Sequence, residues 1–294
     1  MSTEVLICAL LANIMFALSV QVFAHYSKSV SAAWMNYFKA FVALFCFTAT
    51  VIIIGGTFVY PVKVIGMLLL SGAVGLAIGD FCLLAAFKEM GPGRAMVIVS
   101  TGPLIMFGLS YWVHKKGIAP QQLLAIAFMI ACMLTIAMES FKKNAHWHLK
   151  GIILVISAVI LDSLGGILVK EVSQTYGNIS DFEGNVFRCL GAVSFFLILS
   201  LFKPMNLFKN FKKQSSKGKI LILIASILGT FIALTLLYRA IRLIDGNLAL
   251  ITGINVTGSV LATVFECIHR KTWPSKYLII AIFFMIIGLY IFYI

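Results

Sequence analysis

The chain of 294 residues is 61% hydrophobic and only 11% charged, whereas soluble domains are usually about 45–50% apolar and 25% charged. This composition excludes an ordinary soluble domain and indicates a membrane protein. At about 20 apolar residues per helical span, the length accommodates on the order of ten spans and no sizeable soluble domain. The net charge of +13 comes mainly from lysines and arginines in short loops, so we expect no nucleic-acid partner.

Apolar runs separated by proline, glycine and charged residues predict ten transmembrane segments in chain order. They cover residues 4–24, 32–54, 64–87, 94–113, 119–138, 150–169, 184–202, 219–241, 246–267 and 275–293. All ten are expected to be α-helices, because a helix satisfies its own backbone hydrogen bonds in lipid and these runs do not alternate as barrel strands would. The predicted fold class is an all-α polytopic membrane protein.

Positive charge is distributed unequally between the two sets of loops. Loops after odd-numbered segments carry fifteen lysines and arginines, six of them within 203–219, and loops after even-numbered segments carry six. Cytoplasmic loops hold the excess of positive charge in most membrane proteins. The 203–219 loop is therefore predicted to be cytoplasmic, and both termini are predicted to lie outside.

The second half of the chain repeats features of the first. Equivalent positions hold the same or related residues: Asn36 and Asn185, Phe38 and Phe187, Lys39 and Arg188, and Asn13 and Asp162 at a shift of 149 residues, and Pro120 and Pro274 at a shift of 154. Each half has five segments, so the second must cross the membrane in the opposite sense. We predict two inverted five-helix repeats, over 1–145 and 146–294, with a binding site near the midplane between them. Chance similarity between apolar sequences is the alternative.

Further features in the first half carry a family resemblance. A cation is followed by alanine, valine and leucine in the second segment (39–44), the run 85–95 joins the third and fourth segments, and Pro103 lies in the fourth. With the five-plus-five arrangement, these features resemble the drug/metabolite transporter superfamily in its ten-helix form with two EamA-type halves. The usual arginine of the second segment is Lys39 here, and the Trp-Gly pair of the first segment is absent, so the resemblance leaves the subfamily open.

The resemblance implies a secondary-active or facilitated transporter that works by alternating access. The expected activity is export of small metabolites such as amino acids across the inner (plasma) membrane, with protons as a candidate coupling ion. The expected partners are a small-molecule substrate and the lipid bilayer, and the chain would act as a monomer or a homodimer. An organic-anion translocator of the sugar-phosphate or nucleotide-sugar type is the alternative, as is a membrane receptor or assembly protein that does not transport.

Charged side chains inside the segments are candidates for function, because each costs roughly 2.5–3.5 kcal/mol at a helix centre on insertion scales. Lys39 and Arg188 could face a shared cavity and bind a carboxylate or phosphate, or could extend their charges to the interface. Asp162, in the middle of the sixth segment, is either an ion-pair partner of one of these cations or a protonatable carboxyl that couples proton flow to transport.

Polar side chains elsewhere in the segments complete the predicted site. Asn13 could address a polar substrate or form an interhelical hydrogen bond. The predicted substrate-binding residues are Asn13, Tyr37, Lys39, Asn185, Arg188 and Asn255, and the predicted proton-coupling residues are Asp80 and Asp162. Tyr37 has the alternative role of an aromatic residue at the membrane interface.

Signatures of enzymes are missing from the sequence. It contains no Gly-x-Ser-x-Gly, no His-Glu-x-x-His and no Gly-rich phosphate loop followed by lysine. The six cysteines lie in apolar stretches without a Cys-x-x-Cys pair, which is typical of small core residues rather than of a metal site. We therefore expect neither an enzyme nor an ATP-driven pump, and no cofactor or metal.

Overall fold

The computed structural model describes residues 2–26, 30–90, 95, 98–99, 101–115, 117–143, 149–177, 179–245 and 247–293. Its elements are helical: α1 (Thr3–Tyr26), α2 (Ala32–Ile53), α3 (Val62–Ser71), η1 (Gly72–Gly79), α4 (Asp80–Met90), α6 (Gly102–His114), α7 (Pro120–Lys143), α8 (Leu149–Thr175), α9 (Asp181–Phe202), α10 (Leu207–Lys212), α11 (Ser216–Ser226), η2 (Ile227–Ile232), α12 (Ala233–Leu243), α13 (Ala249–Arg270) and α14 (Lys276–Tyr293). The predicted boundary between the halves, at residues 145 and 146, lies outside the described residues.

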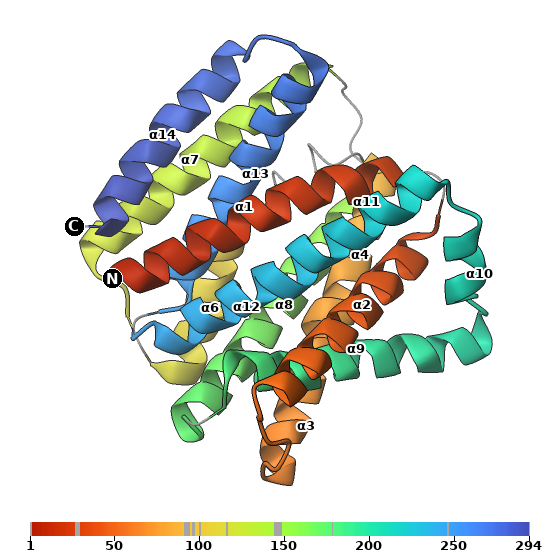
Figure 1. Ribbon diagram of the computed structural model, residues 1–294. Coiled ribbons are helices and arrows are strands. Elements are labelled where there is room, and N and C mark those ends of the chain that lie inside the picture. Colours follow the sequence, from red (N-terminus) through yellow and green to blue (C-terminus); the bar gives the residue numbers. More distant parts are fainter. Residues whose placement is uncertain are drawn as a thin grey trace.

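The described elements form ten membrane-spanning segments, which confirms the predicted all-α fold (Figure 1). The third span is composed of α3, η1 and α4, and the eighth of α11, η2 and α12. Eight spans are long and apolar enough to cross a membrane by themselves, and α6 and α13 contribute shorter apolar stretches. We call the end of the bundle with both termini the terminus face, and the opposite end, with residues 203–219, the lysine face.

The second and seventh spans begin and end at equivalent positions. Ser31 precedes α2 and its side chain accepts a hydrogen bond from the backbone N–H of Trp34, whereas Ser180 precedes α9 and accepts one from Glu183. A serine at this position satisfies a backbone donor that the first helical turn leaves without a partner. Both bounds of α9 lie 149 residues after those of α2 (32 to 181, 53 to 202), in agreement with the shift found in the sequence.

Contacts between the halves have the pattern of an inverted repeat. The first span, α1, packs against the eighth, and its equivalent α8 packs against the third. Equivalent helices also pack against each other, α2 against α9 and α7 against α14 (Figure 1). A twofold rotation that exchanges the halves gives this pattern, with an axis that passes between both pairs of equivalent helices.

The third and eighth spans each contain a π-helical stretch, whereas the sequence predicted uninterrupted α-helices there. The stretches, η1 and η2, occupy equivalent places in the two halves. Side-chain amides bind backbone carbonyls in or beside them: Nδ2 of Asn36 donates to the oxygens of Leu76 (2.9 Å) and Ala77 (3.0 Å), and Nδ2 of Asn185 donates to that of Leu234 (3.2 Å). The equivalent asparagines therefore tie α2 and α9 to the irregular parts of the neighbouring spans.

The third span lies against α9 at a distance that leaves no room for side chains. A Cβ atom at Gly72 would lie 1.7 Å from the carbonyl oxygen of Arg188, and one at Gly191 would lie 2.0 Å from that of Leu69. Small residues allow such close approach, and in lipid the resulting van der Waals contact is a main source of helix association. This contact holds Arg188 against the third span.

The 203–219 segment was expected to be a loop, but it contains the short helix α10 and the first turn of α11. Leu207 and Phe211 lie one helical turn apart in α10 and pack on the aromatic residues at the start of α2. Nε1 of Trp34 donates a hydrogen bond to the carbonyl oxygen of Leu207 (3.1 Å). These contacts explain why a segment with six lysines is helical.

Candidate functional site

A cavity of about 230 Å³ lies inside the bundle between the two halves. Each span from α1 to α13 contributes to its described lining, and its polar lining residues are Lys39, Asp80, Asp162, Ser163, Arg188, Thr230, Thr252, Asn255 and Ser259. Asp162 lies midway along α8. The cavity therefore lies in the membrane interior between helices of both repeats, and charged and polar groups interrupt its mainly apolar lining.

Lys39 of α2 forms an ion pair with Asp80, the first residue of α4. The side chains are 16% and 31% exposed, so the pair is partly open to the cavity. A shift of 154 residues aligns Asp80 with Leu234, which also lines the cavity. The first half thus supplies a carboxylate for its cation, and the second half has an apolar side chain at the equivalent position.

Arg188 is 3% exposed, and hydrogen bonds to neutral groups hold its guanidinium. Its Nε donates to Oγ of Ser71 (3.1 Å) and its Nη1 donates to Oδ1 of Asn185 (3.1 Å), while the Ser71 hydroxyl donates to the carbonyl oxygen of Gly165 (2.8 Å). Arginine has five N–H donors, and the described residues engage two of them. The side chain borders the cavity, so its remaining donors are available to an anionic group there.

The side chain of Asp162 is open to the cavity and makes no hydrogen bond or ion pair with the residues that the structure describes. The sequence left open an ion pair with Lys39 or Arg188, and that interpretation is wrong. Lys39 forms its ion pair with Asp80 instead. Ser71 and Asn185 hold the Arg188 guanidinium by hydrogen bonds at the contact between α9 and the third span. Asp80, Arg188 and Lys39 remain the charges that act on Asp162 through space.

Asn255 of α13 lines the cavity, and Asn13 of α1 lies behind it. Nδ2 of Asn13 donates to Oδ1 of Asn255 (3.2 Å) and to the carbonyl oxygens of Ala9 (2.7 Å) and Ile254 (3.4 Å). Because Oδ1 of Asn255 accepts from Asn13, the amide group of Asn255 is oriented by α1. Asn13 thus forms the interhelical hydrogen bonds that the sequence offered as its alternative role.

The structure brings five of the predicted residues together around the cavity: Lys39, Asp80, Asp162, Arg188 and Asn255. The other three, Asn13, Tyr37 and Asn185, lie outside its described lining. Tyr37 is buried and stacks on Phe196 with ring centroids 5.7 Å apart. Asn185 contacts the cavity only through Arg188, whose guanidinium it positions.

Sequence reasoning missed Ser71 and Ser163. Ser71 ends α3 in a run of small residues, and only the fold places its hydroxyl beside Arg188. Ser163 follows Asp162 in an otherwise apolar run, which was a usable signal for a polar wall. Among the described residues, no group of three or more His, Cys, Asp or Glu side chains is arranged to hold a metal ion.

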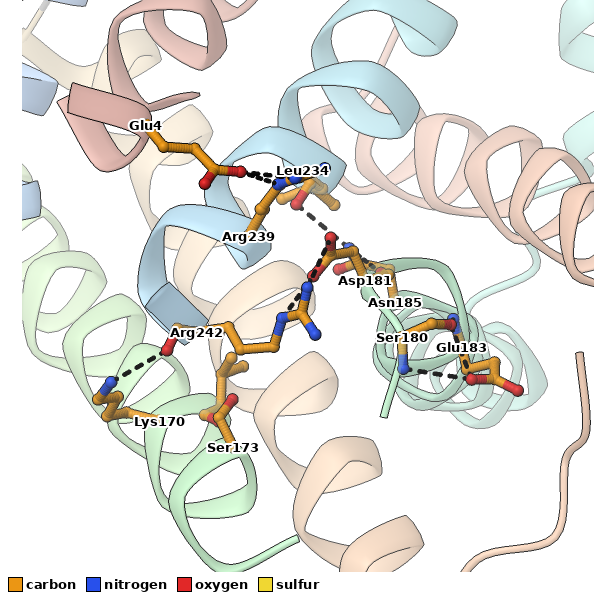
Figure 2. A network of polar contacts seen from close by, with 11 residues as sticks. Glu4, Lys170, Ser173, Ser180, Asp181, Glu183, Asn185, Leu234, Arg239 and Arg242 are labelled. Atoms are coloured by element: carbon orange, nitrogen blue, oxygen red, sulfur yellow. Dashed lines mark hydrogen bonds and ion pairs between the residues drawn. The ribbon is translucent and has the colours of Figure 1, made fainter. Parts of the chain in front are cut away.

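On the terminus face, one ion pair joins the two halves and a second joins two helices of the second half (Figure 2). Glu4 of α1 pairs with Arg239 of α12 (2.5 Å), and Asp181 of α9 pairs with Arg242 of α12 (3.0 Å). Nζ of Lys170, in α8, donates to the carbonyl oxygens of Arg242 (3.3 Å) and Ile244 at the end of α12. This terminus-face network connects α1, α8, α9 and α12.

The α2–α3 connection is tied to α9 on the same face. Glu183 accepts hydrogen bonds from the backbone N–H of Thr57 (2.9 Å) and from the hydroxyl of Tyr60 (2.6 Å). Burial and the hydrogen bond to Glu183 raise the pKa of Tyr60, so its hydroxyl stays protonated and donates. Tyr238, between the cavity residue Leu237 and Arg239 in the sequence, is fully buried. The terminus face is thus held together by polar contacts between helices.

Comparisons with known proteins agree with the two-half architecture. The sequence profile of the EamA-like transporter family matches residues 3–138 and, a second time, residues 149–294. A crystal structure of another protein superposes on the chain with a TM-score of 0.78 at 15% sequence identity, over 98% of this chain and 95% of the other. That similarity concerns the fold alone. No curated protein sequence gives a significant match.

Proposed function

The chain belongs to the EamA-like transporter family, and on this premise we propose that it is a secondary-active or facilitated transporter that exports small polar metabolites such as amino acids by alternating access. The observation that carries the proposal is the mid-bundle cavity, because cations from equivalent positions of the two repeats, Lys39 and Arg188, meet there. We further propose that the chain lies in the inner (plasma) membrane with its lysine face in the cytoplasm.

The charges of the cavity favour a substrate that carries both signs. Lys39 is neutralised by Asp80, which leaves Arg188 to bind a carboxylate and Asp162 to attract an ammonium group. A single opposite charge on the substrate would leave one of these two groups without compensation in the membrane interior. An amino acid satisfies both.

The volume of the cavity supports a small substrate. Sites for drug-sized ligands measure about 300–1,000 Å³, and this cavity measures about 230 Å³. A nucleotide-sugar exceeds that volume, whereas an amino acid fits. An organic anion of the size of a sugar phosphate is the second candidate, favoured by the guanidinium of Arg188, which has no carboxylate partner among the described residues.

We assign proton coupling to Asp162 before Asp80. Asp162 is open to the cavity and makes no hydrogen bond or ion pair with the described residues, so it is free to load and release a proton, whereas Asp80 is engaged by Lys39. Protonation of Asp162 would remove the charge that attracts an ammonium group. Proton binding and substrate binding would then compete, which is the basis of exchange transport.

The terminus-face network serves as the closed gate in this proposal. The Glu4–Arg239 pair between α1 and α12 joins the two halves and stabilises the closed arrangement of this face, and the Asp181–Arg242 pair holds α9 to α12 within the second half. Rocking of the halves would have to break the first of these pairs before the cavity could open there. The contacts of Glu183 with the α2–α3 connection would break in the same step.

A thermal-shift screen of the purified chain tests the proposal, because a ligand that binds the folded state raises its apparent stability. Amino acids, phosphorylated sugars and lipophilic cations form the panel. We expect stabilisation by amino acids, its loss in Arg188→Gln and its retention in Lys63→Gln, which removes an exposed cation far from the cavity. Stabilisation by phosphorylated sugars alone would favour the second candidate, and an amino-acid shift that survives Arg188→Gln would refute the assigned site.

A further inference from the structure

The short helix α10 lies on the lysine face with one side packed against the bundle and the other exposed. The packed side consists of Leu207 and Phe211, which are partly buried, and the ring of Phe211 stacks on that of Phe38 with centroids 4.7 Å apart. Together with the hydrogen bond from Trp34 to the Leu207 carbonyl, these contacts fix α10 against the start of α2. The backbone positions from which the side chains of the opposite side extend are therefore fixed.

The exposed side of α10 borders a surface hollow of about 450 Å³ lined by Phe208, Lys209, Lys212 and Lys213. These four residues form two pairs at a spacing of four, so they lie side by side over one helical turn. The segment 203–219 has six lysines and no acidic residue. Like charges at this spacing repel one another, and a bound anion would relieve that repulsion.

An apolar path leads from this hollow toward the membrane interior. The ring of Phe208 meets that of Phe41 on α2 edge to face, with centroids 5.8 Å apart. Phe45 lies one helical turn after Phe41 in α2, further from the lysine face, and is 72% exposed. The hollow thus combines cations at its rim with exposed aromatic rings along the helix below.

We propose that this hollow binds an anionic phospholipid of the surrounding bilayer, with the phosphate among Lys209, Lys212 and Lys213 and an acyl chain along Phe208, Phe41 and Phe45. The charge complementarity favours a headgroup with net negative charge over a zwitterionic one. The exposed aromatic rings favour a lipid over a soluble phosphate, which would leave them without a partner. The bound lipid would hold α10 at the membrane surface.

Native mass spectrometry of the delipidated, full-length chain in detergent tests the proposal by counting bound lipids during titration. We expect dioleoylphosphatidylglycerol to bind more tightly than dioleoylphosphatidylcholine. The variant K209Q/K212Q/K213Q should weaken phosphatidylglycerol binding on the order of a hundredfold, given the contribution of each lysine near an anionic surface. Equal affinity of wild type and variant, or equal affinity for the two lipids, would overturn the proposal.

The matched control K203Q/K217Q/K219Q removes the same charge from the same segment but from outside the hollow. At physiological ionic strength it should change binding by no more than about threefold, because charges beyond roughly 8 Å are screened. Weakening equal to that of the first variant would mean that general loop charge, and not the hollow, attracts the lipid. Such a result refutes the assigned site.

A second pair of measurements separates a lipid from a free phosphate and does not depend on the lysine variants. Phe208→Ala keeps every charge and should weaken phosphatidylglycerol binding about tenfold, since burial of one large apolar side chain contributes roughly 1.5–3 kcal/mol. Glycerol 3-phosphate at equal concentration should not displace the lipid. Full displacement by glycerol 3-phosphate, or unchanged lipid binding in Phe208→Ala, would contradict the lipid assignment.

Discussion

At the first position after the π-helical stretch of the third span the chain has Asp80, and the equivalent position of the eighth span has Leu234. This one difference sets the charge of the cavity. Lys39 has a carboxylate partner, whereas Arg188 at the equivalent position has none among the described residues. Arg188 is therefore the cation that remains available to a substrate.

Leu234→Asp tests this asymmetry, because it places a carboxylate where it can reach Arg188 as Asp80 reaches Lys39. The new carboxylate would compete with that of the substrate, and we expect affinity to fall roughly 10- to 150-fold, the equivalent of one hydrogen bond to a charged group. Binding is measured by calorimetry on purified protein. Leu234→Asn is the control of matched shape without charge, and an equal loss in both variants would point to packing as the cause.

Asp162→Asn mimics the protonated carboxyl and tests proton coupling. We expect it to abolish uphill transport driven by a pH gradient and to lower substrate affinity, because the variant lacks the charge that attracts the ammonium group. Exchange of labelled for unlabelled substrate should continue at raised substrate concentration, because exchange needs no net proton movement. Both are measured in proteoliposomes. Transport that remains fully pH-dependent in Asp162→Asn would eliminate this role and leave Asp80 as the next candidate.

At the scale of the elements, the terminus-face pairs differ in exposure and hence in strength. The Asp181 side chain is 10% exposed and that of Arg242 is 31% exposed, whereas Glu4 and Arg239 are each about half exposed. Exposed pairs contribute about 0–1 kcal/mol, and loss of one partner from a buried pair costs more. The less exposed pair, of α9 with α12, lies within the second half, so closure between the halves should depend mainly on the buried Glu183 and its contacts with the α2–α3 connection.

Glu183→Gln, which weakens the hydrogen bonds of α9 with the α2–α3 connection of the other half, is expected to raise the opening of the terminus face severalfold. Arg242→Gln is the matched control, because it breaks a pair within the second half and should have little effect on opening. The rate of maleimide labelling of a cysteine introduced at Thr252, a cavity residue near the start of α13, reports the opening. A larger effect from Arg242→Gln than from Glu183→Gln would contradict this ranking.

Close packing of the third span on α9 makes a second prediction at this scale. Gly72→Ala places a methyl group into the backbone of Arg188 and should lower the unfolding temperature and the yield of folded protein. Gly66→Ala is the matched control from the same span, since no atom lies within 4 Å of its added Cβ, and it should be neutral or slightly stabilising. Equal stability of the two variants would show that the close approach is dispensable.

Some of these elements could be predicted from the sequence and others could not. Apolar length predicts the ten spans, and the repeated Asn-x-Phe-cation pattern finds Lys39 and Arg188, because both signals are local in sequence. The partner of Lys39 could not be predicted, since a π-helical stretch rotates the residues that follow it, Asp80 among them, away from their α-helical positions. Helix α10 was hidden for another reason: six residues are too few for a periodic signal.

At the scale of the whole molecule, the proposed mechanism uses the exchanged contacts of the two halves as two ways of closing around one cavity. A rotation that opens one face of an inverted repeat closes the other, because equivalent contacts lie on opposite sides of the membrane. The sequence could predict this symmetry from the odd number of spans in each half. It could not predict which face the structure closes with ion pairs, because that depends on distant residues such as Glu4 and Arg239 meeting in the fold.

The most direct test of alternating access is the labelling of a single cysteine at Thr252 in a chain whose six native cysteines are replaced. An impermeant maleimide added to intact cells, or to inverted vesicles, should label this residue from both faces, and substrate should protect it in both cases. A cysteine at Lys212 should react only from the cytoplasmic face, which fixes the orientation. Labelling of Thr252→Cys from one face alone, with substrate, without substrate and at every pH, would mean a fixed pocket and would contradict transport through this cavity.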